Sequence, residues 1–319
     1  MNNILNSIKQ ANALEKSGQY ADAARIFESA VKNINKDEYL KEYLFCVNSL
    51  GACYFALKNY SSAIVNFDLA AIHLENNNMR QEYFDAKMLS ALCHRYNDRS
   101  LTGILFAANN MSELADKCSE ENFYETAAWC DYYCGEMYFS LTGYNHAIDY
   151  LEKSVQLFKK DSSLDLGIAL SLLGWVYFLA GNPITSLSII EKHFLHIRDT
   201  NYDRSFGQSY LLFAIIISII PDIMPLMQIY ICRICGIAPL PELFLEHAES
   251  VSKCNDFSES LALCYLAGFL IFKNSDPQKA EIYSRKFLDI YDDNFLEHPF
   301  ICKYISLIHY PASMESSTG

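Results

Sequence analysis

The feature that most constrains this chain is a small residue that returns at nearly constant spacing. Alanine or glycine recurs at intervals of 40, 40, 44, 39, 40 and 54 residues, at Ala11, Gly51, Ala91, Gly135, Gly174, Ala214 and Gly268. A fixed period of this length is the signature of a repeat protein, in which each unit buries its apolar side against its neighbours. The chain has 319 residues, of which 51% are apolar, so it can build a long buried interior by stacking such units.

Each copy also carries aromatic and small residues at helical spacing. Tyr54 follows Gly51 by three residues, and Ala63 and Phe67 follow later in the same copy. The matching residues elsewhere include Tyr138 and Ala147 after Gly135, Tyr177 and Ser186 after Gly174, Ala23 and Phe27 after Ala11, and Ala280 and Phe287 after Gly268. The small residues let two helices approach closely. The aromatic residue fills the remaining gap, and its full burial contributes about 1.5–3 kcal/mol.

These blocks resemble the tetratricopeptide repeat (TPR), whose signature is a Leu-Gly pair, a Tyr three residues on, a Gly-x-Tyr turn, and then Ala and an aromatic residue. The resemblance covers roughly residues 5–290. Its long spacing is similar to that of bacterial peptide receptors and kinesin-light-chain-like adaptors. It implies an all-α fold, a right-handed α-solenoid of about seven TPR-like helical hairpins. We expect a single superhelical domain over residues 1–310 and a flexible tail over residues 311–319.

The sixth copy, residues 206–235, is highly apolar, and a window of about 20 apolar residues is long enough for a transmembrane helix. In the repeat register, however, Pro221 and Asp222 fall where the turn between two helices belongs. Both residues suit a turn and disfavour a helix interior. We therefore expect two buried helices at 206–220 and 223–235, with a membrane segment as the alternative. An insertion at 236–250, beginning with the loop 237–241, explains the long last interval.

One side of the first helix of each hairpin is expected to face away from its partner helix. A helix turns by about 100° per residue, so the residues on that side form a stripe. The resemblance places this stripe on the inner, concave surface of the solenoid, which is the usual binding face. The candidate peptide- or partner-binding residues are Asn12, Phe45, Asn48, Met88, Arg95, Trp129, Tyr132, Glu136, Leu172 and Trp175. Packing inside a tightly wound superhelix is the alternative for each of them.

Two kinds of residue favour a binding groove over simple packing. Both tryptophans of the chain, Trp129 and Trp175, lie on the stripe, and Trp and Tyr are enriched at interface hot spots. The side-chain amides of Asn12 and Asn48 each offer a donor and an acceptor to a peptide backbone. On this hypothesis Trp175→Ala leaves the helices intact and weakens binding by about 2 kcal/mol, whereas unfolding of that variant would identify Trp175 as a core residue.

The resemblance also constrains the ligand. Members of the family that capture chaperone C-termini use Lys and Asn in the first repeat, Asn in the second and a basic pair in the third. This chain has Lys9, Asn12 and Asn48, but Asp85 and Leu89 replace the basic pair. An apolar or amphipathic peptide or helix therefore suits the groove better than an acidic tail.

The sequence carries few signs of catalytic or metal chemistry. Cys232 and Cys235 form an isolated Cys-x-x-Cys pair, whereas a structural zinc site needs two further ligands. His193 and His196 are spaced by three residues, unlike the four-residue spacing of a catalytic zinc helix. Cys130 and Cys134 lie one helical turn apart, which helix packing explains. We therefore expect no catalytic residues, no metal and no cofactor, and hence a protein that is not an enzyme.

The charge and the cysteines indicate partner class and compartment. A net charge of −13 disfavours nucleic acid, which requires a basic surface. The N-terminus lacks the pattern of a secretory signal, and eleven irregularly spaced cysteines suit a reducing cytoplasm better than a disulfide framework. The partner is expected to be a protein or peptide. The alternative function is an assembly or regulatory subunit that forms a homodimer or docks on a membrane complex through residues 206–241.

Overall fold

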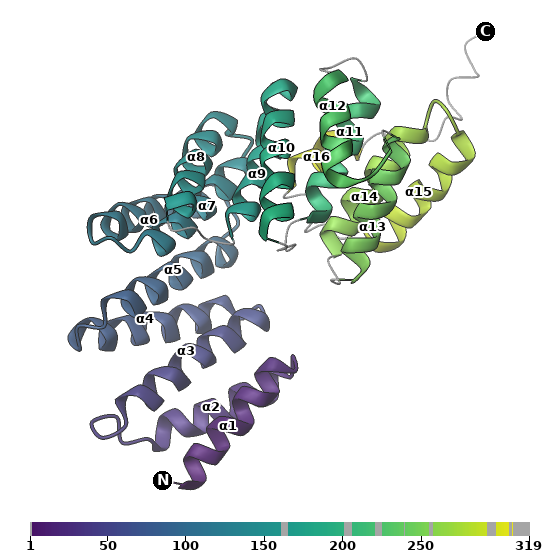
Figure 1. Ribbon diagram of the computed structural model, residues 1–319. Helices are drawn as coiled ribbons and strands as arrows, with labels where there is room; N and C mark the ends of the chain where they lie inside the picture. Colours follow the sequence, from purple (N-terminus) through teal and green to yellow (C-terminus); the bar gives the residue numbers. More distant parts are fainter. Residues whose placement is uncertain are drawn as a thin grey trace. The chain divides into compact units, whose positions relative to one another are not determined.

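The computed structural model describes residues 2–160, 165–200, 206–220, 225–238, 240–254, 258–291, 298–305 and 308. Helices are the only regular secondary structure in these ranges (Figure 1). They are α1 (Asn2–Lys16), α2 (Tyr20–Asn33), α3 (Leu40–Ala56), α4 (Tyr60–Asn76), α5 (Arg80–Asn97), α6 (Leu101–Glu120), α7 (Tyr124–Ser140), α8 (Tyr144–Lys160), α9 (Leu166–Leu179), α10 (Pro183–Thr200), α11 (Phe206–Ile219), α12 (Pro225–Cys235), α13 (Pro241–Cys254), α14 (Ser258–Phe272), α15 (Pro277–Ile290) and α16 (Pro299–Tyr304). The predicted all-α fold of about seven helical hairpins is confirmed.

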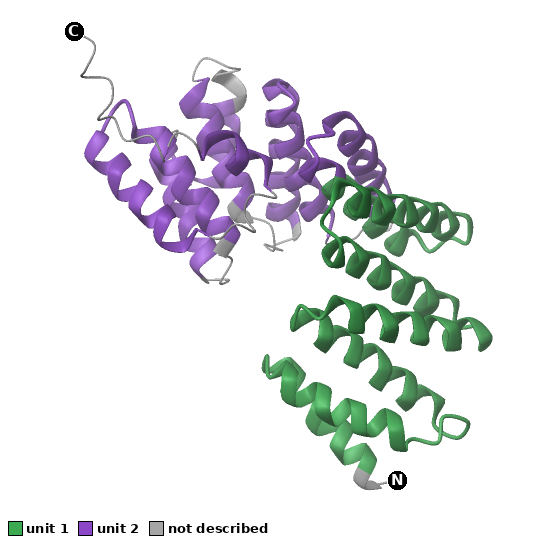
Figure 2. Ribbon diagram, turned by 180° about the vertical axis from the view of Figure 1, so that it is seen from behind, with its two compact units in different colours: residues 1–137 green, residues 138–319 purple. Residues whose placement is uncertain are grey.

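The chain divides into two compact units, residues 1–137 and 138–319, and the boundary falls inside α7 (Figure 2). Unit 1 contains the hairpins α1/α2, α3/α4 and α5/α6 and most of α7. Unit 2 contains the last residues of α7 and the helices α8 to α16. The single domain expected over residues 1–310 stays a prediction, and the tail expected at 311–319 lies outside the described residues.

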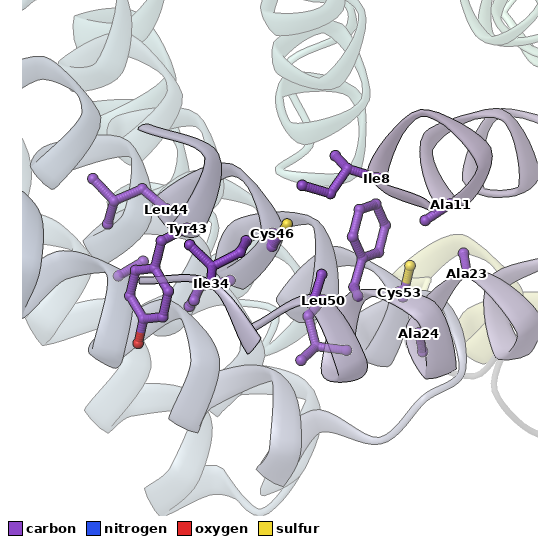
Figure 3. Packing of buried hydrophobic residues seen from close by; sticks show 14 of the residues in the cluster. Ile8, Ala11, Ala23, Ala24, Ile34, Tyr43, Leu44, Cys46, Leu50 and Cys53 are labelled. Carbon is purple, nitrogen blue, oxygen red and sulfur yellow. The ribbon is translucent and has the colours of Figure 1, made fainter. Parts of the chain in front are cut away.

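The recurring small residues lie at helix crossings. A Cβ atom added to Gly51 of α3 would come within 2.8 Å of the Phe67 ring on α4, and one added to Gly268 of α14 within 2.5 Å of the Tyr283 ring on α15. Ala11 and Ala23 are fully buried in the first hairpin and share one cluster with Ile8, Leu50 and Cys53 (Figure 3). Only a residue with little or no side chain permits these close approaches, which explains why alanine or glycine recurs at this position of the repeat.

The turns inside the hairpins share one hydrogen-bonding pattern. Lys58, Thr142 and Gly181 each have a positive φ, at 59°, 57° and 83°. The N–H group of the next residue then donates back to a carbonyl five residues earlier, from Asn59 to Tyr54 at 2.9 Å and from Asn182 to Tyr177 at 2.9 Å. This is the Schellman type of helix ending, which satisfies carbonyls that the helix leaves unpaired. Lys58, Thr142 and Gly181 each follow the small residue of their repeat by seven positions, so the turn keeps the repeat register.

A tyrosine ties each of two hairpins to the preceding one. The hydroxyl of Tyr54 on α3 donates to Glu28 on α2 in unit 1. In unit 2 the hydroxyl of Tyr177 on α9 donates to Oε1 of Glu152 on α8 at 2.6 Å. Tyr54 and Tyr177 occupy the same repeat position, three residues after Gly51 and Gly174, so the repeat has preserved the contact in both units.

The sixth hairpin differs from the predicted one. Helices form at both expected places, α11 and α12, but α11 packs against α13, whereas α12 contacts α10. Most of the insertion expected at 236–250 is therefore the second helix of the hairpin, and α12 is the inserted element. Phe244, Leu245 and Ala248 give α13 a fully buried stripe, whereas α12 leaves Ile229 and Tyr230 exposed. Pro221 and Asp222 lie outside the described residues. No helix in the described ranges is long and apolar enough to span a membrane.

Candidate functional site

The first helices of unit 1, α1, α3, α5 and α7, carry most of the predicted binding residues. We call the following set the first-helix face of unit 1: Asn12, Phe45, Asn48, Met88, Trp129, Tyr132 and Glu136. Phe45 is 41% exposed, and the others are partly buried. Side-chain contacts connect these helices. The rings of Phe55 on α3 and Tyr96 on α5 are 5.6 Å apart, and Arg95 on α5 reaches Glu136 on α7.

The most aromatic part of this face is on α7. The Trp129 ring lies 5.5 Å from the Tyr132 ring in an edge-to-face arrangement and 5.8 Å from the Tyr133 ring in a stacked one. All three side chains are partly buried. Spacings of three and four residues place them on one side of the helix. They form a rigid apolar surface with polar edges, which is the character of an interface hot spot.

Arg95 is a buried residue that contacts this face through Glu136. It is only 3% exposed, its Nη2 is 3.9 Å from Oε1 of Glu136, and its guanidinium lies 4.7 Å from the centre of the Tyr96 ring. A buried guanidinium needs such partners because desolvation of an isolated charge is costly. Arg95 was predicted to contact a partner, but it is buried, and Glu136, whose side chain is 30% exposed, is the more accessible member of the pair.

A second polar group joins α5 to α7 near the start of both helices. The Thr126 hydroxyl donates to Oδ1 of Asp85 at 2.7 Å, and the Gln81 amide donates to Thr126 at 2.7 Å and to Asp85 at 3.1 Å. Burial raises the pKa of Asp85, and the hydrogen bonds from Thr126 and Gln81 oppose that rise. Oδ1 of Asp85 therefore accepts its hydrogen bonds from residues of the same chain. The negative charge of Asp85 disfavours an acidic ligand.

Asn48 on α3 differs from these paired groups. Its Oδ1 atom is buried, and no donor of the described chain reaches it. Its neighbour on the face, Phe45, lies 6.0 Å from the Phe27 ring and is largely exposed. A buried amide oxygen is normally hydrogen-bonded, so Asn48 is an exception among the polar groups of this face. The sequence placed Asn48 on this face because Asn12 and Asn48 lie on the same side of their first helices.

The two candidate residues of unit 2 are placed differently. Leu172 on α9 is partly buried. Trp175 is 0% exposed, and its ring lies 5.2 Å from Phe300 and 5.4 Å from His298. The expectation of an accessible Trp175 is therefore wrong for this structure, because the segment that contains α16 covers it. The contact with α16 could not be predicted from the sequence, because α16 has only six residues and follows no repeat.

The residues that suggested chemistry lie in helices, where Cys232 and His193 are buried and Cys235 and His196 are partly buried. Burial raises the pKa of Cys235 to about 12, so its thiol is protonated at neutral pH. Burial lowers the pKa of His193 to about 3, with a smaller contribution from His196, and its Nδ1 is 2.5 Å from the hydroxyl of Ser209. Among the described residues, no group of three or more His, Cys, Asp or Glu is placed to hold a metal ion.

Comparisons with known proteins identify the fold. No protein-family profile matches the sequence, and a search of curated proteins returns no match. Among solved structures, the apo form of RapI is similar with a TM-score of 0.66 at 13% identity, over 90% of this chain and 97% of that one. A Rap protein complexed with Competence and Sporulation Factor has a TM-score of 0.58 at 12% identity, over 89% of this chain and 73% of that one.

A third structure names the repeat. It is a signal transduction ATPase from Pyrococcus horikoshii with a tetratricopeptide repeat sensor. It matches with a TM-score of 0.63 at 13% identity over 96% of this chain, which spans 44% of that protein. The chain thus has the TPR fold, as its sequence predicted.

Proposed function

We propose that this protein is a non-enzymatic receptor that holds a peptide, or a helix of a partner protein, on the first-helix face of unit 1. The observation that carries the proposal is the aromatic cluster on α7, where the Trp129 ring lies 5.5 Å from Tyr132 and 5.8 Å from Tyr133 and all three side chains are partly buried. Two asparagines on the same face, Asn12 and Asn48, are partly buried and offer side-chain amides to the backbone of a ligand.

The rest of the face indicates the character of the ligand. Phe45 and Met88 provide apolar contacts, and Trp129 and Tyr132 provide large, rigid rings with polar edges. Such a surface favours an apolar or amphipathic segment over a highly charged one. The structure of a Rap protein in complex with Competence and Sporulation Factor supports the proposal, since it shows a protein of this fold with a bound factor.

The cysteines support a cytoplasmic location. Those that the structure describes are free, and most of them are buried in helix packing. Buried thiols of this kind are typical of proteins in a reducing compartment.

The proposal can be tested with random peptides displayed on phage and selected against the whole protein. We expect selected peptides to lose affinity for Trp129→Ala by about 2 kcal/mol, roughly thirtyfold in Kd. Asn48→Leu keeps the size of the side chain and removes both hydrogen-bonding groups, so we expect a loss of roughly tenfold. Val65→Ala, at a position 65% exposed on the second helix α4, is the matched control and should bind as the wild type does. Peptides that bind all four proteins equally would rule out this face.

A second candidate function rests on exposed apolar residues around α12. Ile219, Ile229, Tyr230 and Leu240 are each between 45% and 52% exposed. Solvent-exposed apolar side chains of this size, close together in sequence, favour self-association or docking on another protein. We propose that this region forms a homodimer contact. Sedimentation should show a dimer at low micromolar concentration that Ile229→Asp dissociates. A wild-type monomer under these conditions would contradict the proposal.

A further inference from the structure

The C-terminal helix of unit 2 packs against first helices. The Phe300 ring of α16 lies 5.2 Å from Trp175 on α9, and the backbone of α16 lies next to α14. His298 directly precedes α16, and its ring lies 5.4 Å from Trp175 and 5.4 Å from Phe139 at the end of α7. The segment 298–304 therefore contacts α9, α14 and the last residues of α7, all within unit 2.

These contacts involve the side of the repeat that the sequence assigned to binding. Trp175 belongs to the predicted stripe. Phe178 lies three residues after Trp175, with its ring 6.4 Å away, and Phe139 lies three residues after Glu136, so both are on the same side of their helices. The stripe of unit 2 is thus occupied by seven residues of the same chain, His298-Pro299-Phe300-Ile301-Cys302-Lys303-Tyr304. A short segment lying on first helices has the geometry of a bound peptide.

The segment also has the composition of a peptide with one binding side. Pro299, Phe300 and Ile301 are buried, whereas Cys302 and Lys303 are exposed. The helix is capped from within the segment, because the Phe300 N–H group donates to Nδ1 of His298 at 3.3 Å. A single helix of six residues cannot form a hairpin, so α16 is not an eighth repeat.

The contact leaves one buried group unsatisfied. Nε1 of Trp175 is buried, and no acceptor of the described chain reaches it. Indole N–H groups usually find a partner when buried. The segment therefore packs against the Trp175 ring without accepting a hydrogen bond from Nε1. A peptide that places a carbonyl near Nε1 would bind better.

We propose that residues 298–304 act as a built-in ligand of unit 2, and that a partner peptide with an adjacent aromatic and aliphatic residue, like Phe300 and Ile301, binds unit 2 by displacing them. This site is separate from the first-helix face of unit 1 and does not depend on the function proposed for that face. The partner would compete with a ligand that the chain itself supplies.

The competition sets the expected affinities. A tethered ligand acts at an effective concentration of millimolar order when its linker is short. A free peptide of the same sequence must overcome that concentration, so its apparent Kd for the wild type is the sum of its intrinsic Kd and the effective concentration, and is at least about millimolar. We expect an intrinsic Kd of about 0.1 mM or less, so weakening the tethered copy should lower the apparent Kd at least tenfold.

The test uses the whole chain with Trp129→Phe, so that fluorescence reports on Trp175 alone, and a capped peptide with the sequence of residues 298–304. Phe300→Ala should shift Trp175 emission to longer wavelength with the helical circular dichroism unchanged. It should also bind the peptide at least tenfold more tightly than its parent does. Lys303→Ala changes an exposed residue of the same helix and is the matched control, with the parent's emission and affinity. An unshifted emission, or no gain in peptide binding, would overturn the proposal.

A second measurement needs no substitution in the segment. Hydrogen exchange of the wild type should show that the amides of residues 300–304 exchange faster than those of α9 and α14, because the segment can leave while the repeats stay folded. Exchange of the segment only together with α9 and α14 would show that it is an integral part of the core. The same conclusion, against the proposal, would follow if Phe300→Ala unfolded unit 2.

Discussion

Units 1 and 2 each contain one tryptophan on the same side of a first helix, and the two residues have opposite environments. Trp129 in unit 1 is partly buried and lies beside two tyrosines on α7. Trp175 in unit 2 is 0% exposed beneath His298 and Phe300. The repeat determines the direction in which each side chain points. Whether that direction leads to solvent depends on a segment more than a hundred residues further along the chain.

The two tryptophans therefore show that the ability of a surface to bind polypeptide and its exposure to solvent are separate properties. An aromatic stripe on first helices identifies a surface that can bind a segment of polypeptide. In unit 2 the structure shows such a segment in place, and it comes from the same chain. In unit 1 the same face keeps Phe45 exposed and leaves Oδ1 of Asn48 without a donor in the described chain.

The largest expected effect separates the two tryptophans. We expect Trp175→Ala to destabilise unit 2 by about 3–5 kcal/mol, because it removes a fully buried ring and leaves a cavity. This replaces the expectation from sequence, in which the variant loses only binding. Trp129→Ala should cost clearly less, since its ring is only partly buried. Urea denaturation followed by circular dichroism measures both, and equal losses would contradict the distinction.

A second difference between the units is their expected response to acid. Burial lowers the pKa of His193 and of His298, both in unit 2, to about 3. An unfolded histidine has a pKa of about 6.5, so protons bind the unfolded state first. The stabilisation is complete above that pH and is lost as the pH falls toward 3. Each histidine should contribute a loss of about 2 kcal/mol between pH 7 and pH 5.

The acid effect can be measured by urea denaturation at the two pH values, with Trp175 fluorescence as the probe in Trp129→Phe. Burial also lowers the pKa of His247 in unit 2, so His298→Gln should reduce the loss between pH 7 and pH 5 by about 2 kcal/mol and leave the contributions of His193 and His247. An unchanged pH dependence in this variant would show that His298 is not responsible.

The glycines at helix crossings should rank by the space around them. Gly268→Ala and Gly51→Ala would force a methyl group against the rings of Tyr283 and Phe67, and we expect losses of about 1–3 kcal/mol. At Gly174 the nearest atom to an added Cβ is Cδ2 of Leu212 at 3.3 Å, which can move. The better helix propensity of alanine, up to about 1 kcal/mol, should then nearly compensate. Shifts in the midpoint of urea denaturation give the ranking.

The smallest expected effect is one that both units share. Tyr54→Phe and Tyr177→Phe remove the hydroxyls that donate to Glu28 and Glu152. Each contact is at least partly solvated, so we expect losses of at most about 1 kcal/mol and of similar size. The same denaturation experiment applies. A much larger loss in one variant would show that the repeat contact is not equivalent in the two units.

The sequence by itself determined the repeat, the first helices and the direction of their side chains. Gly51 and Gly268 predicted helix crossings, because those crossings depend on contacts within one hairpin. Asn12, Asn48 and Trp129 could be assigned to a common side for the same reason. Local periodicity is sufficient for any contact between elements adjacent in the chain.

Only the tertiary structure decided what covers that side. The pairing of α11 with α13 and the burial of Trp175 by the segment that contains α16 both join elements that are not consecutive. A periodic pattern does not predict such contacts, because α12 and α16 are short and are not part of the repeat. The burial of Arg95 beneath Glu136 likewise depends on two neighbouring hairpins. Exposure is a property of the whole packed chain, and a helical stripe specifies only a direction.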